Sequence, residues 1–154
     1  MKQKLQSFLE KIEGIWLSQR TIYCLKTKNF YNNYSKVNIS KQNNLRKSNL
    51  ERNEIYYYKD LNTSGNNYIY NFISKSFPFN EGLIRKNTNK YIENYKYKIY
   101  SINCLQIESI KKHIEYIEYI YFINKNFRIS ITTIKKLKKY LYISFSSEIK
   151  VINN

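Results

Sequence analysis

The order of apolar and polar residues along the chain predicts a short helix followed by a series of strands. Over residues 2–12, apolar side chains recur at the i, i+3, i+4 and i+7 spacing of an amphipathic helix. They are Leu5, Phe8, Leu9 and Ile12. Gly14 is well placed to end this helix. The pattern then becomes extended, so Trp16, Ser18 and Arg20 are expected to share one face of the first strand.

Segments rich in aromatic and β-branched residues predict further strands. These segments are residues 54–60, 67–74 and 95–107. The turn-forming sequence from Asn62 to Asn67 predicts a hairpin between the first two of them. Residues 26–48 are mostly polar, and we expect only a brief strand there, around residues 37–39.

The carboxyl-terminal part continues this pattern. The segment from Phe77 to Lys86 holds the only proline and predicts a turn that leads into a strand. From His113 to Phe122 isoleucine recurs every third residue, as in a helix, but the β-branched and aromatic content favours a strand. Two more strands surround a lysine-rich turn at residues 135–139. A helix and then eight to ten strands are typical of an antiparallel up-and-down β-barrel.

Composition supports one mainly β domain over residues 1–154. The chain is long enough for a hydrophobic core, and 17 tyrosines and eight phenylalanines against one proline and three glycines favour strands. The bias toward Asn, Lys, Ile and Tyr is what an AT-rich genome encodes. We therefore do not interpret individual lysines as functional signals.

The formal net charge of +16 allows two interpretations. It could serve an acidic partner, namely nucleic acid, an anionic membrane or an acidic protein. It could equally reflect codon bias that places lysines on solvated faces of the molecule. The lysines are spread along the chain, apart from the run at residues 135–139.

Several classes of site are disfavoured by the residues present. Cys24 and Cys104 are too few for a disulfide framework or a zinc site, and His113 is the only histidine. No apolar run is long enough to span a membrane, and no signal-peptide core is present. We expect a soluble protein without a targeting peptide, a metal or a membrane partner.

Three motifs in order resemble the CpcS/CpeS family of phycobiliprotein lyases. "GIWLSQRTIY" from Gly14 resembles the family's opening motif, Gly-Lys-Trp-x-Ser-Gln-Arg-Thr-x-Tyr. "YFINKNFRISITTIKK" from Tyr121 resembles its Trp-Phe-Ala-x-x-Asn-Leu-Arg-x-Arg-Thr-Ser stretch. "SFSSEIKVI" from Ser144 resembles its Ser-Phe-x-Ser-Glu-Ile-Arg ending. Residues 26–110 match loosely, through "EGLIRK" and scattered aromatic residues.

The resemblance implies a lipocalin-like β-barrel that binds an open-chain tetrapyrrole, phycocyanobilin or phycoerythrobilin. The enzyme attaches this bilin through a thioether bond to a cysteine of an alpha or beta phycobiliprotein subunit of the phycobilisome. The bilin is then a substrate, and no permanent cofactor is expected. The composition fits a gene of a red-algal type plastid, which places the protein in the chloroplast stroma. Nucleic acid is not an expected partner, and a homodimer is left open.

The same resemblance suggests which residues form the site. Glu148 and Arg128 are the expected catalytic residues. The expected bilin-binding residues are Trp16, Ser18, Arg20, Tyr121, Asn126 and Ser130. Three positions depart from the family pattern: Ser130 replaces its second arginine, Tyr121 its tryptophan and Lys150 its final arginine. The bilin preference therefore cannot be carried over.

Two of these residues have alternative roles. Arg20 could pair with a bilin propionate, or it could cover the Trp16 ring through a cation–π contact. Glu148 could accept pyrrole N–H groups and act as an acid toward the tetrapyrrole, or it could form a structural ion pair with Arg128 or Lys150. The acceptor thiol belongs to the partner, so both cysteines of this chain are expected to be small core residues.

Two other functions remain as alternatives. One is a bilin carrier without transferase activity, which needs the same pocket. The other is a basic protein that binds single-stranded nucleic acid through aromatic stacking and lysines. The stretches "IYYYKDL" and "YKYKIY" partly support the second alternative.

Overall fold

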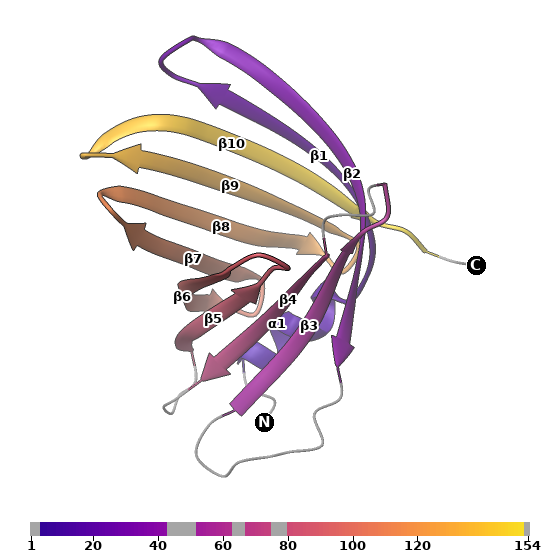
Figure 1. Ribbon diagram of the computed structural model, residues 1–154. Coiled ribbons are helices and arrows are strands. Elements are labelled where there is room, and N and C mark those ends of the chain that lie inside the picture. Colours follow the sequence, from indigo (N-terminus) through magenta and orange to yellow (C-terminus); the bar gives the residue numbers. More distant parts are fainter. Residues whose placement is uncertain (1–3, 43–51, 63–66, 75–79, 153–154) are drawn as a thin grey trace.

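The computed structural model describes residues 4–42, 52–62, 67–74 and 80–152. Over these residues one helix precedes ten strands that form a closed barrel (Figure 1). The helix is α1 (Lys4–Ile12), and the strands are β1 (Gly14–Cys24), β2 (Asn29–Gln42), β3 (Arg52–Asp60), β4 (Asn67–Ser74), β5 (Glu81–Asn87), β6 (Ile92–Ser101), β7 (Cys104–Lys111), β8 (Ile114–Asn124), β9 (Phe127–Lys136) and β10 (Lys139–Lys150). Each strand pairs antiparallel with its chain neighbours, and β1 pairs with β10 to close the barrel.

The predicted fold class is confirmed, including the short amino-terminal helix and the lysine-rich turn. The segment that allowed either helix or strand forms β8. The turn between β9 and β10 places Leu137 and Lys138 at positive φ. β3 and β4 pair as the predicted hairpin, although residues 63–66 of its connection lie outside the described residues. The segment from residue 75 to 79 also lies outside them.

Two expectations about strand boundaries were wrong. The brief strand around residues 37–39 is part of the 14-residue β2, which pairs with β1 along the whole length of β1. Its polar residues gave no apolar alternation, because cross-strand pairing rather than burial holds that part extended. The single strand expected over residues 95–107 is split into β6 and β7 by a turn at Ile102 and Asn103, which contains neither glycine nor proline.

The helix packs against one end of the barrel and fixes the start of β1 there (Figure 1). Its apolar face is buried together with Trp16 and Phe122. The Phe8 and Phe122 rings meet edge to face with centroids 5.1 Å apart. The indole Nε1 of Trp16 donates a 2.8 Å hydrogen bond to the carbonyl of Ile12, the last residue of the helix. Helix and barrel are thus joined at the tryptophan of the opening motif.

Gly14 allows a close approach at this junction. Its φ is +130°, a conformation that residues with a side chain rarely adopt. A Cβ at this position would lie 3.3 Å from Cδ of Lys150. The amine of Lys150 donates a 2.8 Å hydrogen bond to the carbonyl of Lys11. The glycine therefore lets the final strand cross directly behind the end of the helix.

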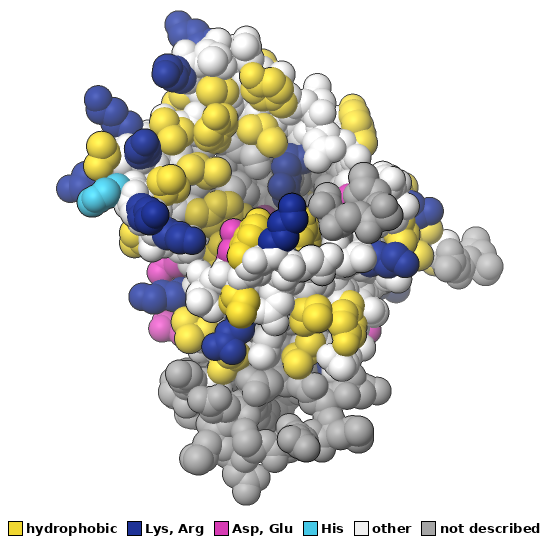
Figure 2. All heavy atoms as spheres, in the orientation of Figure 1, with side chains coloured by type: hydrophobic (Ala, Val, Ile, Leu, Met, Phe, Trp, Pro, Cys, Tyr) yellow, Lys and Arg dark blue, Asp and Glu magenta, His cyan; other side chains and the backbone are white. Residues whose placement is uncertain are grey.

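The positive charge is dispersed over the face of the molecule that Figure 2 shows. Figure 2 shows Lys and Arg side chains scattered among apolar and neutral ones on the visible face, with no continuous basic stripe there. None of the helices in the described part of the chain has the length and apolar character needed to cross a membrane.

Candidate functional site

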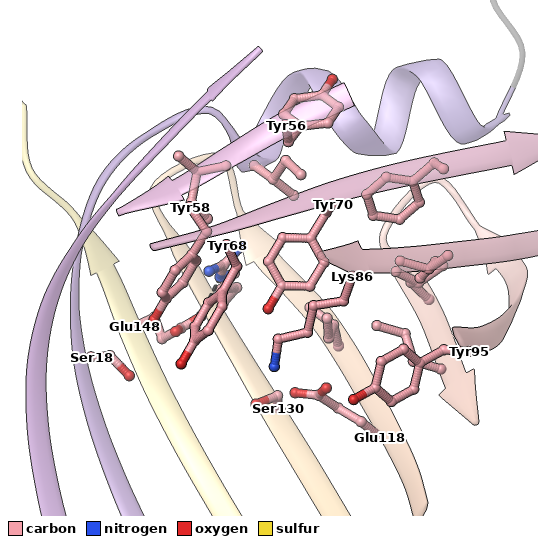
Figure 3. A pocket seen from close by; sticks show the side chains of 18 of the residues that line it. Ser18, Tyr56, Tyr58, Tyr68, Tyr70, Lys86, Tyr95, Glu118, Ser130 and Glu148 are labelled. Atoms are coloured by element: carbon pink, nitrogen blue, oxygen red, sulfur yellow. Dashed lines mark hydrogen bonds and ion pairs between the residues drawn. The ribbon is translucent and has the colours of Figure 1, made fainter. Parts of the chain in front are cut away.

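The barrel contains a pocket of about 380 Å³. Alternate residues of nearly every strand point into it, because side chains along a β-strand alternate between the two faces. One part of its wall is polar and comes from β1, β9 and β10, while β3, β4, β6 and β8 supply tyrosines (Figure 3). The arrangement suits a long ligand with aromatic rings and charged groups.

Trp16 is fully buried beside the end of the helix and is not itself a lining residue of the pocket. Two cations lie over its ring. The Cζ atom of Arg128 is 4.3 Å from the ring centroid, and the Nζ atom of Lys150 is 4.9 Å from it. Burial lowers the pKa of the Lys150 amine, and the neighbouring charge of Arg128 lowers it further. Through its cation–π contact, the Trp16 ring fixes the position of the Arg128 guanidinium.

The guanidinium of Arg128 forms an ion pair with the carboxylate of Glu148. The two residues lie opposite each other on β9 and β10, so the pairing of these strands sets their contact. The side chains are only 9% and 13% exposed, which makes this a largely buried pair. Ser18 lies opposite Glu148 on β1, so a row of polar residues crosses three strands. The structural ion pair considered for Glu148 is present, with Arg128 as its partner.

The next row along the barrel contains Arg20, Ser146 and Ser130, again across β1, β10 and β9. The Nε atom of Arg20 donates a 2.9 Å hydrogen bond to Oγ of Ser146. Arg20 therefore points toward β10, and the cations over the Trp16 ring are Arg128 and Lys150. Arg20 is an exposed residue that lines the pocket, and the remaining donors of its guanidinium can meet an acidic group.

Tyrosines form the opposite wall of the pocket (Figure 3). The ring centroids of Tyr58 and Tyr68 are 5.5 Å apart, and those of Tyr58 and Tyr70 are 6.1 Å apart. Tyr95 and Tyr116 form another edge-to-face pair at 5.8 Å. Burial raises the pKa of Tyr58 to about 12, and it raises the pKa of Tyr70, Tyr95 and Tyr116 as well. These phenols are therefore neutral at physiological pH.

A second group of charged residues lies on this tyrosine side. The amine of Lys86 on β5 is 3.5 Å from Oε2 of Glu93, which also accepts a 2.7 Å hydrogen bond from the hydroxyl of Tyr95. Glu118 on β8 accepts a 2.8 Å hydrogen bond from the hydroxyl of Tyr116. Lys86 and Glu118 both line the pocket.

The structure brings five of the expected site residues together on the pocket wall. They are Ser18, Arg20, Arg128, Ser130 and Glu148. Trp16 supports Arg128 from the helix end. Tyr121 and Asn126 do not line the pocket. Tyr121 stacks on Tyr119 with centroids 6.2 Å apart, and the next residue, Phe122, faces the core instead. Asn126 lies in the turn between β8 and β9.

An aromatic wall was expected from the family resemblance, but its individual tyrosines and its charged residues were not predicted from the sequence. The "EGLIRK" stretch was noted for its likeness to the family, but Lys86 was not recognised as a lining residue. Strand alternation could have indicated it, because Ile84 is buried and Lys86 shares its parity. The same rule places Tyr116 and Glu118 with Ile120, once the segment is taken as a strand.

Neither cysteine lines the pocket. Cys24 is buried, and hydrogen bonds with Thr27 lower the pKa of its thiol. Cys104 is partly buried, and this burial raises the pKa of its thiol. Within the described residues, no cluster of three or more His, Cys, Asp or Glu side chains could hold a metal ion.

Fold and site together define a lipocalin-like β-barrel with an internal pocket for a ligand. No protein-family profile matches the chain. A curated protein from Gracilaria tenuistipitata var. liui, "Chromophore lyase CpcS/CpeS homolog", is 36% identical over 148 residues, which cover 96% of this chain and 98% of the relative. The chain therefore belongs to the CpcS/CpeS chromophore lyase family, as the three motifs predicted.

Solved structures agree with this fold. The S-type phycobiliprotein lyase CpeS from Guillardia theta superposes with a TM-score of 0.67 at 12% identity, covering 97% of this chain and 94% of that chain. A protein of unknown function from the DUF3598 family of Nostoc punctiforme gives a TM-score of 0.58 at 7% identity. That match covers 93% of this chain and 49% of the other. At such low identity, these likenesses concern the fold alone.

Proposed function

We propose that this protein attaches an open-chain tetrapyrrole, phycocyanobilin or phycoerythrobilin, to a cysteine of a phycobiliprotein subunit. The thiol adds across the exocyclic ethylidene double bond of ring A. A bond forms between sulfur and the exocyclic carbon, and the proton of the thiol is balanced by one delivered to the tetrapyrrole. No oxidant, reductant or permanent cofactor is needed, and the bilin is the substrate.

One observation supports this function most directly. In a member of the chromophore lyase family, the pocket combines a wall of tyrosine rings with the largely buried Arg128–Glu148 pair. Aromatic walls suit a flat conjugated pigment, and a buried carboxylate suits its pyrrole N–H groups. The pocket thus offers one face for the rings and another for the polar groups.

In this proposal the Glu148 carboxylate accepts hydrogen bonds from pyrrole N–H groups. It takes up the proton released by the incoming thiol and delivers a proton to the tetrapyrrole, which makes ring A more electrophilic. Arg128 positions Glu148, since its guanidinium is held between that carboxylate and the Trp16 ring. Arg20 pairs with a propionate, while Ser18 and Ser130 offer hydroxyls from neighbouring rows. By holding one conformer of the bilin, the protein speeds the addition and fixes its stereochemistry.

We extend the proposal to the cellular setting. The acceptor is an alpha or beta phycobiliprotein subunit in the stroma of a red-algal type plastid. The net charge of +16 would steer the protein toward an acidic subunit. A homodimer is compatible with the proposal, and its presence is tested by light scattering of the purified protein.

A reconstituted transfer reaction tests the function. The protein is mixed with bilin and an apo-phycobiliprotein, and the covalent adduct is followed by pigment fluorescence in a denaturing gel and by peptide mass. We expect one adduct at one cysteine, formed faster and with fewer oxidised by-products than without the protein. Reversible bilin binding without faster transfer would indicate a carrier instead. Salt-sensitive binding of single-stranded DNA without any spectral change of the bilin would support the nucleic-acid alternative.

A further inference from the structure

Lys86 places a third cation in the pocket, on the side opposite Arg20 and Arg128. Its side chain is 21% exposed, so most of it is removed from solvent. The amine lies 4.4 Å from the centroid of the Tyr68 ring and 5.9 Å from that of Tyr70. Figure 3 shows this amine extending from β5 into the pocket, past the Tyr70 ring. The aromatic rings hold the amine in place from one side, and its other side faces the pocket.

The amine of Lys86 retains capacity to bind a further acceptor. An ammonium group carries three N–H donors. Its contact with Glu93 measures 3.5 Å, at the long limit for a hydrogen bond. The same oxygen of Glu93 already accepts the hydroxyl of Tyr95 at 2.7 Å. A carboxylate that entered the pocket could therefore make a shorter contact with Lys86 than Glu93 does.

A line of tyrosine rings separates Lys86 from the arginines. The charges of Glu148 and Arg20 both act on the pKa of Tyr58, so this tyrosine lies next to the arginine side of the pocket. Its ring contacts Tyr68, and the Tyr68 ring in turn contacts Lys86. A ligand that contacts both Lys86 and Arg20 must therefore present a flat apolar surface between two acidic groups. An open-chain tetrapyrrole with two propionates has this chemistry.

We propose that Lys86 binds one propionate carboxylate of the bilin while Arg20 binds the other. This inference rests on the proposed function, because it takes the bilin as the ligand. It makes Lys86 a binding residue that selects pigments with two free carboxylates. The three sequence motifs do not include this position, which lies in the loosely matching middle of the chain.

The test compares phycocyanobilin with its dimethyl ester, in which both carboxylates are neutral. Binding of each pigment is titrated by absorbance to the unaltered protein and to Lys86→Met. We expect Lys86→Met to bind the free diacid about tenfold more weakly, since a charge-assisted hydrogen bond contributes about that factor. Both proteins should bind the dimethyl ester equally, because the ester offers Lys86 no charge to pair with.

Lys98 provides a matched control. Its amine is 3.2 Å from Oε1 of Glu81 and 5.6 Å from the centroid of the Tyr100 ring. It thus has a carboxylate and a tyrosine as partners, as Lys86 does, but it lies outside the barrel and is 50% exposed. Lys98→Met should bind both pigments as the unaltered protein does.

Three outcomes overturn the assignment. If Lys86→Met binds the diacid normally, Lys86 makes no contact with a propionate. If it loses affinity for diacid and ester to the same extent, Lys86 only supports the pocket through Glu93 and Tyr68. If the unaltered protein binds neither pigment, the proposed function itself fails and the assignment fails with it.

A second measurement uses the unaltered protein and so does not depend on the folding of a variant. Lysines are acetylated with and without pigment, and the extent at Lys86 and Lys98 is read by peptide mass. At equal occupancy, the diacid should slow acetylation of Lys86 more than the ester does and should leave Lys98 unchanged. Equal protection of Lys86 by diacid and ester would overturn the assignment.

Discussion

Replacing the charges of the Arg128–Glu148 pair, singly and together, separates its contribution to folding from its role toward the pigment. The pair is 9% and 13% exposed, so removing one partner leaves the other charge largely buried. Such a loss typically costs about 3–5 kcal/mol. We expect Arg128→Met and Glu148→Gln each to lower the free energy of unfolding by about 3 kcal/mol, near the lower end because some exposure remains.

The double variant should be far less destabilised than the sum of the single variants. It leaves no unpaired charge, and the methionine side chain introduced by Arg128→Met can still cover the Trp16 ring. We expect a loss of about 1–2 kcal/mol and thus a coupling energy of about 4–5 kcal/mol. We therefore expect the free energy of unfolding of the double variant to be higher than that of either single variant.

Urea unfolding followed by tryptophan fluorescence measures these energies. Trp16 is the only tryptophan, and it lies directly beneath Arg128, so its emission reports on this part of the fold. Transfer assays on the same proteins complete the test, because the double variant should regain stability without regaining activity. Single variants that each cost under about 1 kcal/mol and add without coupling would refute the argument from burial. Normal transfer by the double variant would refute the assigned roles.

Four further predictions test other parts of the structure. Trp16→Ala should lower the free energy of unfolding by about 3–5 kcal/mol, measured by urea denaturation followed by circular dichroism, because it empties a fully buried site. Arg20→Ala should weaken bilin binding in an absorbance titration with little change in melting temperature, since Arg20 does not brace the tryptophan. Replacing Cys24 and Cys104 together by serine should leave transfer largely intact in the gel assay; a folded variant that binds bilin without transferring it would instead point to a thiol relay. Stability should fall from about pH 10 toward pH 12, because the raised pKa of Tyr58 means that the folded protein keeps a proton which the unfolded chain releases; urea midpoints that stay constant across this window would contradict the value of about 12.

The sequence alone determined the architecture. Apolar residues at helical spacing precede Gly14, and many β-branched and aromatic segments follow it. Both patterns indicate local backbone geometry, which can be read from a short stretch of sequence. The alternation from Trp16 also placed Ser18 and Arg20 on one face, because strand parity needs no knowledge of the partner strand. The length of the polar strand β2 was underestimated, because its extended form depends on pairing with β1 and not on a local pattern of residues.

The tertiary structure decided which side chains meet. Parity within one strand could not show that Arg128 contacts Glu148, because their contact depends on the register between β9 and β10. Nor could it place Tyr121, which faces outward although its motif resembles one of the family. Lys86 was one lysine among many in the sequence. Its parity with Ile84 indicates which face of the strand it shares, but only closure of the barrel makes that face the wall of a pocket. The physical reason is that strand geometry is local, whereas a pocket inside a barrel is formed by residues far apart in the chain.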